Sequence, residues 1–364
     1  MAMMDELRAA YSGRRVLLTG HTGFKGSWLA LWLDRLGAQV HGFALAPQET
    51  PNLFDICRVG EHMDHVIGDI REYAATAARI AAVQPDIVLH LAAQPLVRQS
   101  YADPIATMAT NVMGTAHVLE GVRTAGISCA VVVVSSDKCY DNHGWIWGYR
   151  ENDALGGEDP YSASKGATEL VAASWRDSFF TPESGVHLAS ARAGNVVGGG
   201  DWARDRIVPD TIAAFARGES VELRNPRATR PWQHVLEPLG GYLLLGARLL
   251  GHAAADYCEA WNFGPNARDV RPVEDLIGLL AQAWPGANAG WGLAPGTHPP
   301  EARALALNCD KAAARLDWHP TWSLEETMRQ TASWYHAWHS GASDLRALTL
   351  SQIVAFETAS EARQ

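Results

Sequence analysis

The chain has few lysines, no paired cysteines and no long apolar run, and each shortage excludes a class of protein. No uninterrupted apolar segment approaches the roughly 18–20 residues of a membrane span. The opening residues lack the basic and apolar regions of a signal peptide. The five cysteines show no pair at metal-ligand spacing, which argues against a zinc site and a disulfide framework. We therefore expect a cytoplasmic protein without a metal ion and without a membrane anchor.

Basic residues are also scarce as a group. The net charge is −10 and no basic block occurs, so nucleic acid is not expected as a partner. An anionic ligand must then be held by local groups. With 47% apolar residues, the 364-residue chain can bury one large core with a smaller lobe beside it.

Only four of the 30 basic residues are lysines, namely Lys25, Lys138, Lys165 and Lys311. All the other basic residues in this count are arginines. A retained lysine is therefore a candidate for a role that needs a compact ammonium whose pKa can change, which a guanidinium cannot do. A surface position best explains Lys311, whereas the other three lie in the motifs described next.

Three glycines spaced three apart join a strand to a helix near the start of the chain. The apolar run 16–19 predicts a buried strand, and an amphipathic helix is expected to begin after Gly26 and to stop at Gly37. Gly20, Gly23 and Gly26 let the backbone turn tightly and leave the helix N-terminus facing a ligand. An ordinary glycine-rich turn is the alternative, but the flanking strand and helix favour a dinucleotide site.

Strands and helices alternate through the first half of the chain without any hairpin signal. Strands are expected at 40–45, 65–67, 85–93 and from 130, and helices at 72–83, 104–125 and 162–180. This order predicts an α/β fold of Rossmann type, with a doubly wound parallel sheet and a smaller, mostly C-terminal lobe.

Composition suggests the domain boundaries. A dinucleotide-binding domain is expected at 12–195, with 230–262 returning to it, and a substrate lobe at 196–229 and 263–340. Residues 341–364 are expected to form a peripheral helix and tail.

The residues after the expected strands leave the choice of dinucleotide open. An acidic residue after the second strand would bind the ribose hydroxyls of NAD, and an arginine would favour NADP, but the strand runs into Ala46 and Pro47. Asp69, after the third strand, could meet the adenine amine. The small residues Ala92 and Ala93 at the end of the fourth strand suit a closely bound cofactor.

Tyr161 and Lys165 are four residues apart on an expected helix and therefore share a face. A cation beside a phenol stabilises the phenolate, so we expect the pKa of Tyr161 to be lowered and the residue to act as a general base. Ser136, Asp137 and Lys138 end the fifth strand, where ligands bind in open α/β sheets. An acid beside a potential base is what an elimination requires.

Seven runs together resemble CDP-glucose 4,6-dehydratases, in the nucleotide-sugar branch of the extended short-chain dehydrogenase/reductase superfamily. The runs are Thr19-Gly-His-Thr-Gly-Phe-Lys-Gly26, His90-Leu-Ala-Ala-Gln-Pro-Leu-Val-Arg98, Ser136-Asp-Lys-Cys-Tyr-Asp-Asn142, Trp145-Ile-Trp-Gly-Tyr-Arg-Glu151, Asp159-Pro-Tyr-Ser-Ala-Ser-Lys165, Arg192-Ala-Gly-Asn-Val-Val-Gly-Gly-Gly-Asp-Trp202 and Arg230-Pro-Trp-Gln-His-Val235. Sister enzymes that act on dTDP-glucose or GDP-mannose typically have Glu where this chain has Lys138, which favours the CDP-sugar branch.

The resemblance implies a reaction with NAD as the cofactor. Tyr161, with Lys165 and Ser136, takes the proton of the glucose 4-hydroxyl while C4 gives hydride to NAD⁺. A base then removes the C5 proton as protonated Asp137 gives its proton to the departing 6-hydroxyl, and hydride returns to C6. Lys138 is either that base or a cation that stabilises the enolate or contacts the cofactor.

The resemblance also implies binding residues and a homodimer, with the helices near 104–125 and 162–180 at its interface. The expected cofactor contacts are Gly20, His21, Thr22, Gly23, Phe24, Lys25, Gly26, Asp69, Ile70, Leu91, Ala92, Ala93, Asn111, Ser135, Tyr161 and Lys165. The expected contacts to a CDP-sugar substrate are Gln94, Asn195, Arg206 and Arg230.

Three other functions remain open at this point. Another nucleotide-hexose 4,6-dehydratase would differ only in the base it recognises, and a nucleotide-sugar 4-epimerase would share Tyr161 and Lys165 without needing Asp137. A non-catalytic dinucleotide sensor would not be expected to combine all of these residues. Four tryptophans either pack in the core or stack on the substrate, namely Trp145, Trp147, Trp202 and Trp232. The run 298–301 receives no role.

Overall fold

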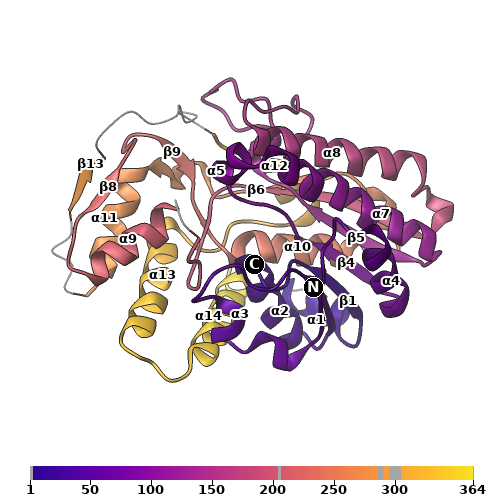
Figure 1. Cartoon of the computed structure of the whole chain (residues 1–364), viewed down its shortest axis with the longest axis horizontal. Coiled ribbons are helices and arrows are strands. Elements are labelled where there is room, and N and C mark those ends of the chain that lie inside the picture. Colours follow the sequence, from indigo (N-terminus) through magenta and orange to yellow (C-terminus); the bar gives the residue numbers. More distant parts are fainter. Residues whose placement is uncertain (1–2, 204–205, 286–289, 295–304, 364) are drawn as a thin grey trace.

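Seven parallel strands form the central sheet of the computed structural model, which describes residues 3–203, 206–285, 290–294 and 305–363 (Figure 1). Their order across the sheet is β3-β2-β1-β4-β5-β6-β11. Each neighbouring pair is parallel. The strands are β1 (Arg15–Thr19), β2 (Gln39–Ala44), β3 (Asp64–Ile67), β4 (Ile87–His90), β5 (Cys129–Val134), β6 (Val186–Ala193) and β11 (Ala260–Phe263). The chain runs outward from β1 in both directions, which confirms the predicted doubly wound, Rossmann-type fold.

Helices cover both faces of this sheet because its strands are apolar on both sides. Every residue of β5 is buried; Val131 and Val133 pack into one core cluster, and Val132 and Val134 pack into the other. The helices of the first cluster are α4 (Tyr73–Val83), α7 (Gly114–Ala125) and α8 (Pro160–Ser178). Those of the second are α1 (Met3–Tyr11), α2 (Phe24–Arg35), α10 (Leu236–Leu249) and α14 (Leu345–Glu361).

A smaller lobe lies beyond the carboxyl ends of the strands, at the left of Figure 1. Its larger helices are α9 (Ile207–Ala216), α11 (Val273–Ala283) and α13 (Leu324–His339). Its two-stranded sheets pair β8 (Val221–Leu223) with β13 (Trp291–Leu293) and β9 (Thr229–Pro231) with β12 (Val270–Pro272). A third pair, β7 (Val196–Val197) with β10 (Gln233–His234), follows the end of β6. The other short helices are α3 (Leu53–Ile56), α5 (Val97–Ala102), α6 (Pro104–Met108) and α12 (Asp310–Leu316).

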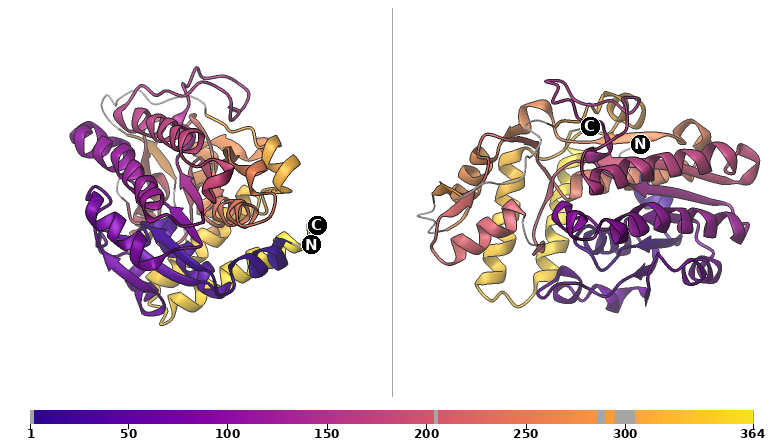
Figure 2. Two further views of the ribbon diagram at one scale, coloured as in Figure 1. Left: turned by 90° about the vertical axis from the view of Figure 1, so that its right-hand side faces the viewer. Right: turned by 45° about the horizontal axis from the view of Figure 1, so that its top comes forward.

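The two ends of the chain pack together on the main core, as Figure 2 shows. Helix α1 was not expected from the sequence, and its Tyr11 hydroxyl donates a hydrogen bond to the Leu243 carbonyl at 2.8 Å. Residues 341–364 were expected at the periphery. In the structure Phe356 of α14 lies in the core, and Glu357 accepts a hydrogen bond from Trp32 Nε1 at 3.0 Å. Helix α14 lies there because its apolar face packs against α2, although it is the last helix of the chain.

The helix expected at 104–125 is confirmed, and it runs without a break through α6, a π-helical turn at Ala109–Met113 and α7. The π turn holds Asn111, whose side chain points inward and is buried. Such turns are rare and occur most often at functional sites. The apolar periodicity of the sequence predicts the helix, but it does not show that the π turn holds one more residue than an α-helical turn.

No helix in the described ranges is long and apolar enough to cross a membrane. The five cysteines are free thiols, and the part of the chain that the structure describes holds no group of three or more His, Cys, Asp or Glu side chains placed to bind a metal.

Candidate active site

The segments that follow β1, β4, β5 and β6 meet at one edge of the sheet, because all four strands are parallel. They are the glycine turn, the small residues after β4, the run from Ser135 to Lys138, and Gly194 with Asn195. Helix α8 brings Tyr161 and Lys165 to the same edge. It begins at Pro160, where the Asp159 side chain accepts a hydrogen bond from Ser162 N at 2.9 Å.

The glycine turn is shaped by contacts of the protein with itself. A Cβ at Gly26 would lie 2.1 Å from the Gly20 carbonyl oxygen, and one at Gly20 would lie 2.7 Å from Ala92 N. Gly20 also has a φ of +79°, which other residues seldom adopt. At Gly23 a Cβ would meet only the Gly20 carbonyl oxygen, at 3.4 Å. The first and third glycines are thus required by packing, and Gly23 leaves the backbone open to a ligand. The helix begins at Phe24 rather than after Gly26, because the third glycine lies in its first turn.

The side chains of this turn point in different directions. The Thr22 hydroxyl donates a hydrogen bond to the Leu45 carbonyl at 2.8 Å. The His21 ring is buried against Phe54 and His65, and burial lowers its pKa to about 4, so the ring is neutral. Only the backbone of His21 is therefore available to a cofactor.

Lys25 points into the interior of the site. Its Nζ lies 3.4 Å from the Tyr242 hydroxyl. Burial, together with the positive charges of Lys165 and Arg206, lowers the pKa of Lys25 to about 7, while the charge of Asp137 opposes the shift. The lysine of the glycine turn is thus in electrostatic contact with the residues expected to act on the substrate.

The residues expected near the adenine and the nicotinamide lie at neighbouring strand ends. The Asp69 carboxylate pairs with Arg71 at 2.5 Å, and Ile70 packs against the glycine that begins α7. After β4, Ala92 N donates a hydrogen bond to Thr19 Oγ1 at 3.2 Å, which fixes Leu91 to Ala93 beside the glycine turn.

Asn111 and Gln94 are both engaged by the protein. Asn111 Oδ1 accepts a hydrogen bond from Gln94 N at 2.8 Å, and its Nδ2 donates to Ser164 Oγ at 2.8 Å. The Gln94 amide group bonds Leu96 in its own loop and the Thr107 hydroxyl on α6. Asn111 thus ties the segment after β4 to α8, and neither side-chain amide is directed at a ligand in this structure.

Ser136 and Tyr161 lie side by side. A hydrogen bond with Ser136 favours the Tyr161 phenolate, but burial outweighs it and raises the pKa of Tyr161 to about 12. The predicted lowering of this pKa is therefore wrong for the protein alone, because desolvation exceeds every favourable charge. Lys165 Nζ donates to the Val134 carbonyl at 3.4 Å, and burial lowers the pKa of Lys165 to about 8.

Asp137 is a buried acid with room beside it. Ser136 Oγ donates a hydrogen bond to its Oδ1 at 3.0 Å, whereas its Oδ2 has no hydrogen-bond partner among the described residues. Burial raises the pKa of Asp137. The cations around it, chiefly Lys138, and the hydrogen bond from Ser136 oppose the shift. A Cβ at Gly194 would lie 2.9 Å from Oδ2, so the glycine keeps the space next to the acid open.

The residues expected to contact the substrate phosphates lie at the start of the smaller lobe. Arg206 donates to Asp201 Oδ2 at 2.8 Å, and this neighbour raises the pKa of Arg206. Arg230 lies on β9, where its guanidinium donates to the Thr229 carbonyl at 2.8 Å, and its charge reaches Asp137. Asn195 accepts a hydrogen bond from Gln233 N through its backbone, at 3.1 Å.

A buried ion pair of Glu169 and Arg192, at 2.9 Å, was missed by the sequence analysis. Ser135, expected to contact the cofactor, instead donates its hydroxyl hydrogen bond to Glu169. The signal was present in the spacing, because Glu169 follows Lys165 by four residues and so lies on the same face of α8.

The four tryptophans divide between the core and the surface. Trp232 is buried, and Trp202 packs edge-on against Trp334, Tyr335 and Trp338. Trp145 and Trp147 are exposed and lie next to each other, with ring centroids 5.7 Å apart. The run 298–301 lies outside the described residues.

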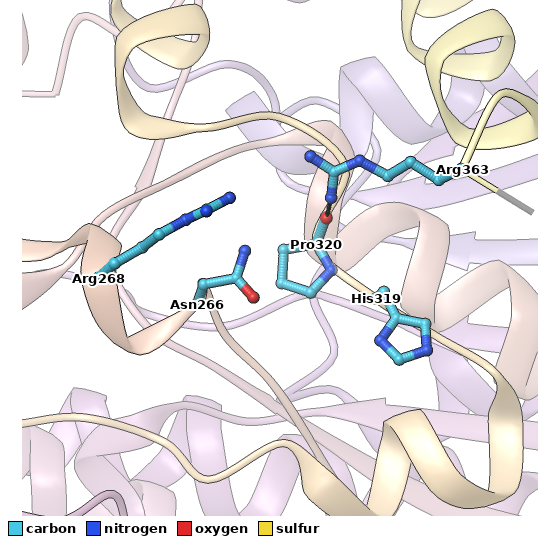
Figure 3. Close-up of a pocket in the computed structure, with 5 residues that line it drawn as sticks. All are labelled: Asn266, Arg268, His319, Pro320 and Arg363. Carbon is cyan, nitrogen blue, oxygen red and sulfur yellow. Dashed lines mark hydrogen bonds between the residues drawn. The ribbon is translucent and has the colours of Figure 1, made fainter.

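A surface cavity of about 510 Å³ lies away from the strand ends (Figure 3). Asn266, Arg268, His319, Pro320 and Arg363 line it, and Arg363 donates a hydrogen bond to the Pro320 carbonyl. None of the expected site residues contributes to it, so it is separate from the site at the sheet edge.

The fold and the site define an extended short-chain dehydrogenase/reductase, with a glycine turn after β1 and serine, tyrosine and lysine at the strand ends. A family model described as GDP-mannose 4,6 dehydratase matches residues 17–247, and the chain belongs to this family.

Relatives and solved structures agree with this assignment. The chain is 52% identical over 335 residues to a CDP-glucose 4,6-dehydratase of Salmonella typhimurium, and the match covers 91% of this chain and 93% of the relative. A dTDP-glucose 4,6-dehydratase of Xanthomonas campestris is 26% identical, over 90% and 95% of the two chains.

The solved structures confirm the fold. The epimerase Mth375 of Methanothermobacter thermautotrophicus aligns with a TM-score of 0.78 and 24% identity, over 93% of this chain and 98% of that one. DesIV of Streptomyces venezuelae, a dTDP-glucose 4,6-dehydratase, aligns with a TM-score of 0.72 and 24% identity, over 91% and 99%.

The packing of the glycine turn predicts a large cost for one methyl group. We expect Gly26→Ala to destabilise the protein by about 1–3 kcal/mol or more, because its Cβ would overlap the Gly20 carbonyl. Gly278→Ala is the matched control, since this glycine is also helical but has no atom within 4 Å of the added Cβ. The control should gain up to about 1 kcal/mol from helix propensity. Urea unfolding measures both, and equal midpoints for the two variants would contradict the argument.

Proposed function

We propose that this protein is an NAD-dependent CDP-glucose 4,6-dehydratase, which converts CDP-glucose to CDP-4-dehydro-6-deoxyglucose and water. One observation carries the reaction type: Asp137 is a buried acid with a raised pKa and an unpartnered oxygen, next to Ser136 and Lys138. A 4-epimerase has no use for such an acid. The 52% identity to a CDP-glucose 4,6-dehydratase supports cytidine as the base, since the dTDP-glucose relative is only 26% identical.

The glycine turn fits the pyrophosphate of a dinucleotide. Gly20 and Gly26 allow the close contact between β4, β1 and α2, and Gly23 exposes its backbone at the N-terminus of α2. When bound, NAD⁺ would supply a hydride acceptor for C4 and a hydride donor for C6. The cofactor residues proposed from the sequence include this turn. We infer that His21 contributes through its backbone and that Asn111 positions its neighbours.

In the proposed reaction, Tyr161 accepts the proton of the 4-hydroxyl and Ser136 orients both oxygens by hydrogen bonding. Lys165 is a cation at neutral pH, because its pKa lies at about 8, and its charge stabilises the phenolate. This help is needed, since burial holds the pKa of Tyr161 at about 12 in the protein alone.

Elimination follows at the next two carbons. Once C4 is a ketone, the C5 proton becomes acidic, and Lys138 accepts it. Asp137 donates its proton to the 6-hydroxyl, which leaves as water. A raised pKa suits this step, because the carboxyl must be protonated before it can donate.

The smaller lobe is proposed to hold the CDP end of the substrate. Arg230 lies on β9 and Arg206 precedes α9, and a guanidinium can bind a phosphate through two parallel hydrogen bonds. Asn195 stays a proposed contact, because it lies two residues after the end of β6. The five free thiols favour a reducing compartment, and we place the enzyme in the cytoplasm.

A homodimer is also proposed, through the surface formed by α6, α7 and α8. Helix α8 packs against both α6 and α7, and Figure 2 shows α7 and α8 side by side. Large apolar side chains stay exposed there, with Ile105 78% and Leu170 62% accessible. Met113 and Phe179 extend the patch. Apolar patches of this kind mark association surfaces.

The substrate proposal predicts a product without added cofactor. Incubation with CDP-glucose should give the alkali-induced absorbance of a 4-keto sugar, whereas dTDP-glucose and GDP-mannose should react at least about tenfold more slowly, since one lost base contact costs about 1–3 kcal/mol. Tyr161→Phe provides the inactive control. Product from another nucleotide sugar but not from CDP-glucose would refute the base assignment, and reduced NAD with no keto sugar would refute dehydration.

Two substitutions separate the acid from the base. Lys138→Met should keep C4 oxidation but abolish exchange of the C5 proton with solvent, and Asp137→Asn should keep exchange but lower water loss about 10²–10⁴-fold. Mass spectrometry of the products formed in D₂O measures both. Exchange at the normal rate in Lys138→Met would exclude Lys138 as the base and leave it an electrostatic role.

The dimer surface predicts that one double variant dissociates. Ile105→Glu with Leu170→Glu should yield a monomer, because burying carboxylates in an apolar interface is unfavourable. Ile146→Glu is the matched control, since Ile146 is 95% exposed but lies on a loop outside this surface. Light scattering after size-exclusion chromatography gives the masses. If only Ile146→Glu dissociated the dimer, the interface would lie at the loop that holds Ile146 and the proposed surface would be wrong.

A further inference from the structure

The buried carboxylate of Glu169 lies beneath the proposed catalytic residues and takes no part in the reaction above. It accepts hydrogen bonds from Ser190 Oγ at 2.6 Å, from Arg192 at 2.9 Å and from the Ser135 hydroxyl. Ser135 directly follows β5, and Ser190 and Arg192 belong to β6. Glu169 therefore joins α8 to the ends of the two strands that carry the site.

Arg192 holds this carboxylate in place. Its guanidinium donates to the Tyr140 hydroxyl at 2.7 Å and to the Glu151 carbonyl at 3.0 Å, and it lies 4.9 Å from the centroid of the Tyr140 ring. The side chains of Glu169 and Arg192 are both buried. Charges at such a site are poorly screened and act over several ångströms.

Lys165 lies one helical turn before Glu169, on the same face of α8. The charge of Lys165 also acts on or is affected by Lys25 on α2, His90 on β4 and Cys139 after β5. Tyr161 precedes Lys165 by one turn of α8, and Asp137 and Lys138 lie next to Cys139 in the chain. Burial lowers the pKa of His90 to about 3 and raises those of Cys139 and Asp137, which favours the neutral form of each. Lys25 and Lys138 carry no negative charge in either protonation state, so neither can stabilise the cation of Lys165.

Glu169 differs from all of these groups. Burial would raise its pKa, but Arg192 and the two serine hydroxyls lower it below the ordinary value. It is therefore the ionised carboxylate of this cluster, and its charge opposes the effect of burial on the pKa of Lys165.

We propose that Glu169 is a positioning residue that fixes the end of β5 and keeps Lys165 protonated. The catalytic meaning of this arrangement rests on the proposed function, because there Lys165 acts as a cation on Tyr161. The electrostatic effect of Glu169 on Lys165 is independent of any substrate.

The four lysines of this chain allow a direct test. In protein labelled with ¹³C at the lysine ε carbon, Lys165 is assigned as the resonance absent from Lys165→Arg. Its titration midpoint should lie near pH 8 in the native protein. In Glu169→Gln it should fall by about one pH unit, the smaller end of what a nearby charge contributes. Glu169→Asp and Ser190→Ala keep the negative charge and should keep the midpoint.

The same experiment includes a control for loss of folding. Glu169→Gln leaves Arg192 as a buried cation without a partner, so the double variant Glu169→Gln/Arg192→Gln is measured beside it. A lower midpoint in either folded variant supports the proposal, and an unchanged midpoint in both refutes it.

Turnover supplies a second readout. Lys165 loses its proton as the pH rises through its pKa, so a lower pKa makes kcat/KM for CDP-glucose fall at lower pH. The alkaline limb should therefore move down in Glu169→Gln and stay in place in Glu169→Asp. A uniform loss of rate with no movement of the limb would mean that Glu169 is only structural. If the native protein does not act on CDP-glucose, the proposed function fails while the lysine titration still decides this inference.

Discussion

The contact between the first turn of α2 and the end of β1 is the constraint on which the site depends. The Gly20 carbonyl comes so close to Gly26 that no side chain fits between them, and Gly20 in turn touches the backbone of Ala92 after β4. These contacts draw β1, α2 and β4 together at one edge of the sheet. The parallel sheet then brings the ends of β5 and β6 to the same edge, so the proposed dinucleotide and substrate sites become neighbours.

Burial is the common cause of the unusual proton affinities at this edge. It raises the pKa values of Tyr161 and Asp137 and lowers those of Lys25 and Lys165, because each group loses the water that stabilises its charged form. The shifts suit an acid that must donate a proton. They oppose the loss of a proton from a phenol, so the proposed role of Tyr161 as a base needs a cation, which we assign to Lys165. In this proposal the Glu169–Arg192 pair supports the charge of Lys165 as well as the packing of the strand ends.

Much of the site could be predicted because its chemistry lies in short runs. The spacing of Gly20, Gly23 and Gly26 and the pair Tyr161 and Lys165 are local, so one strand–turn–helix pattern and one helical period were sufficient. The pKa of Tyr161 could not be predicted, because the sequence shows the cation beside it but not the depth of its burial. Asn111 shows the same limit, since its π turn and its bonds to Gln94 and Ser164 join three separate segments.

The sequence by itself determined the order of strands and helices, the Rossmann-type sheet, and the identity of the groups that end each strand. These features follow from periodicity and from residues near one another in the chain. Only the tertiary structure decided that α14 packs on α2, that Ser135 bonds Glu169, and that Arg192 pairs with the same carboxylate. Each of these contacts joins residues more than 20 positions apart. Their energies depend on burial and distance, which a local pattern of residues does not contain.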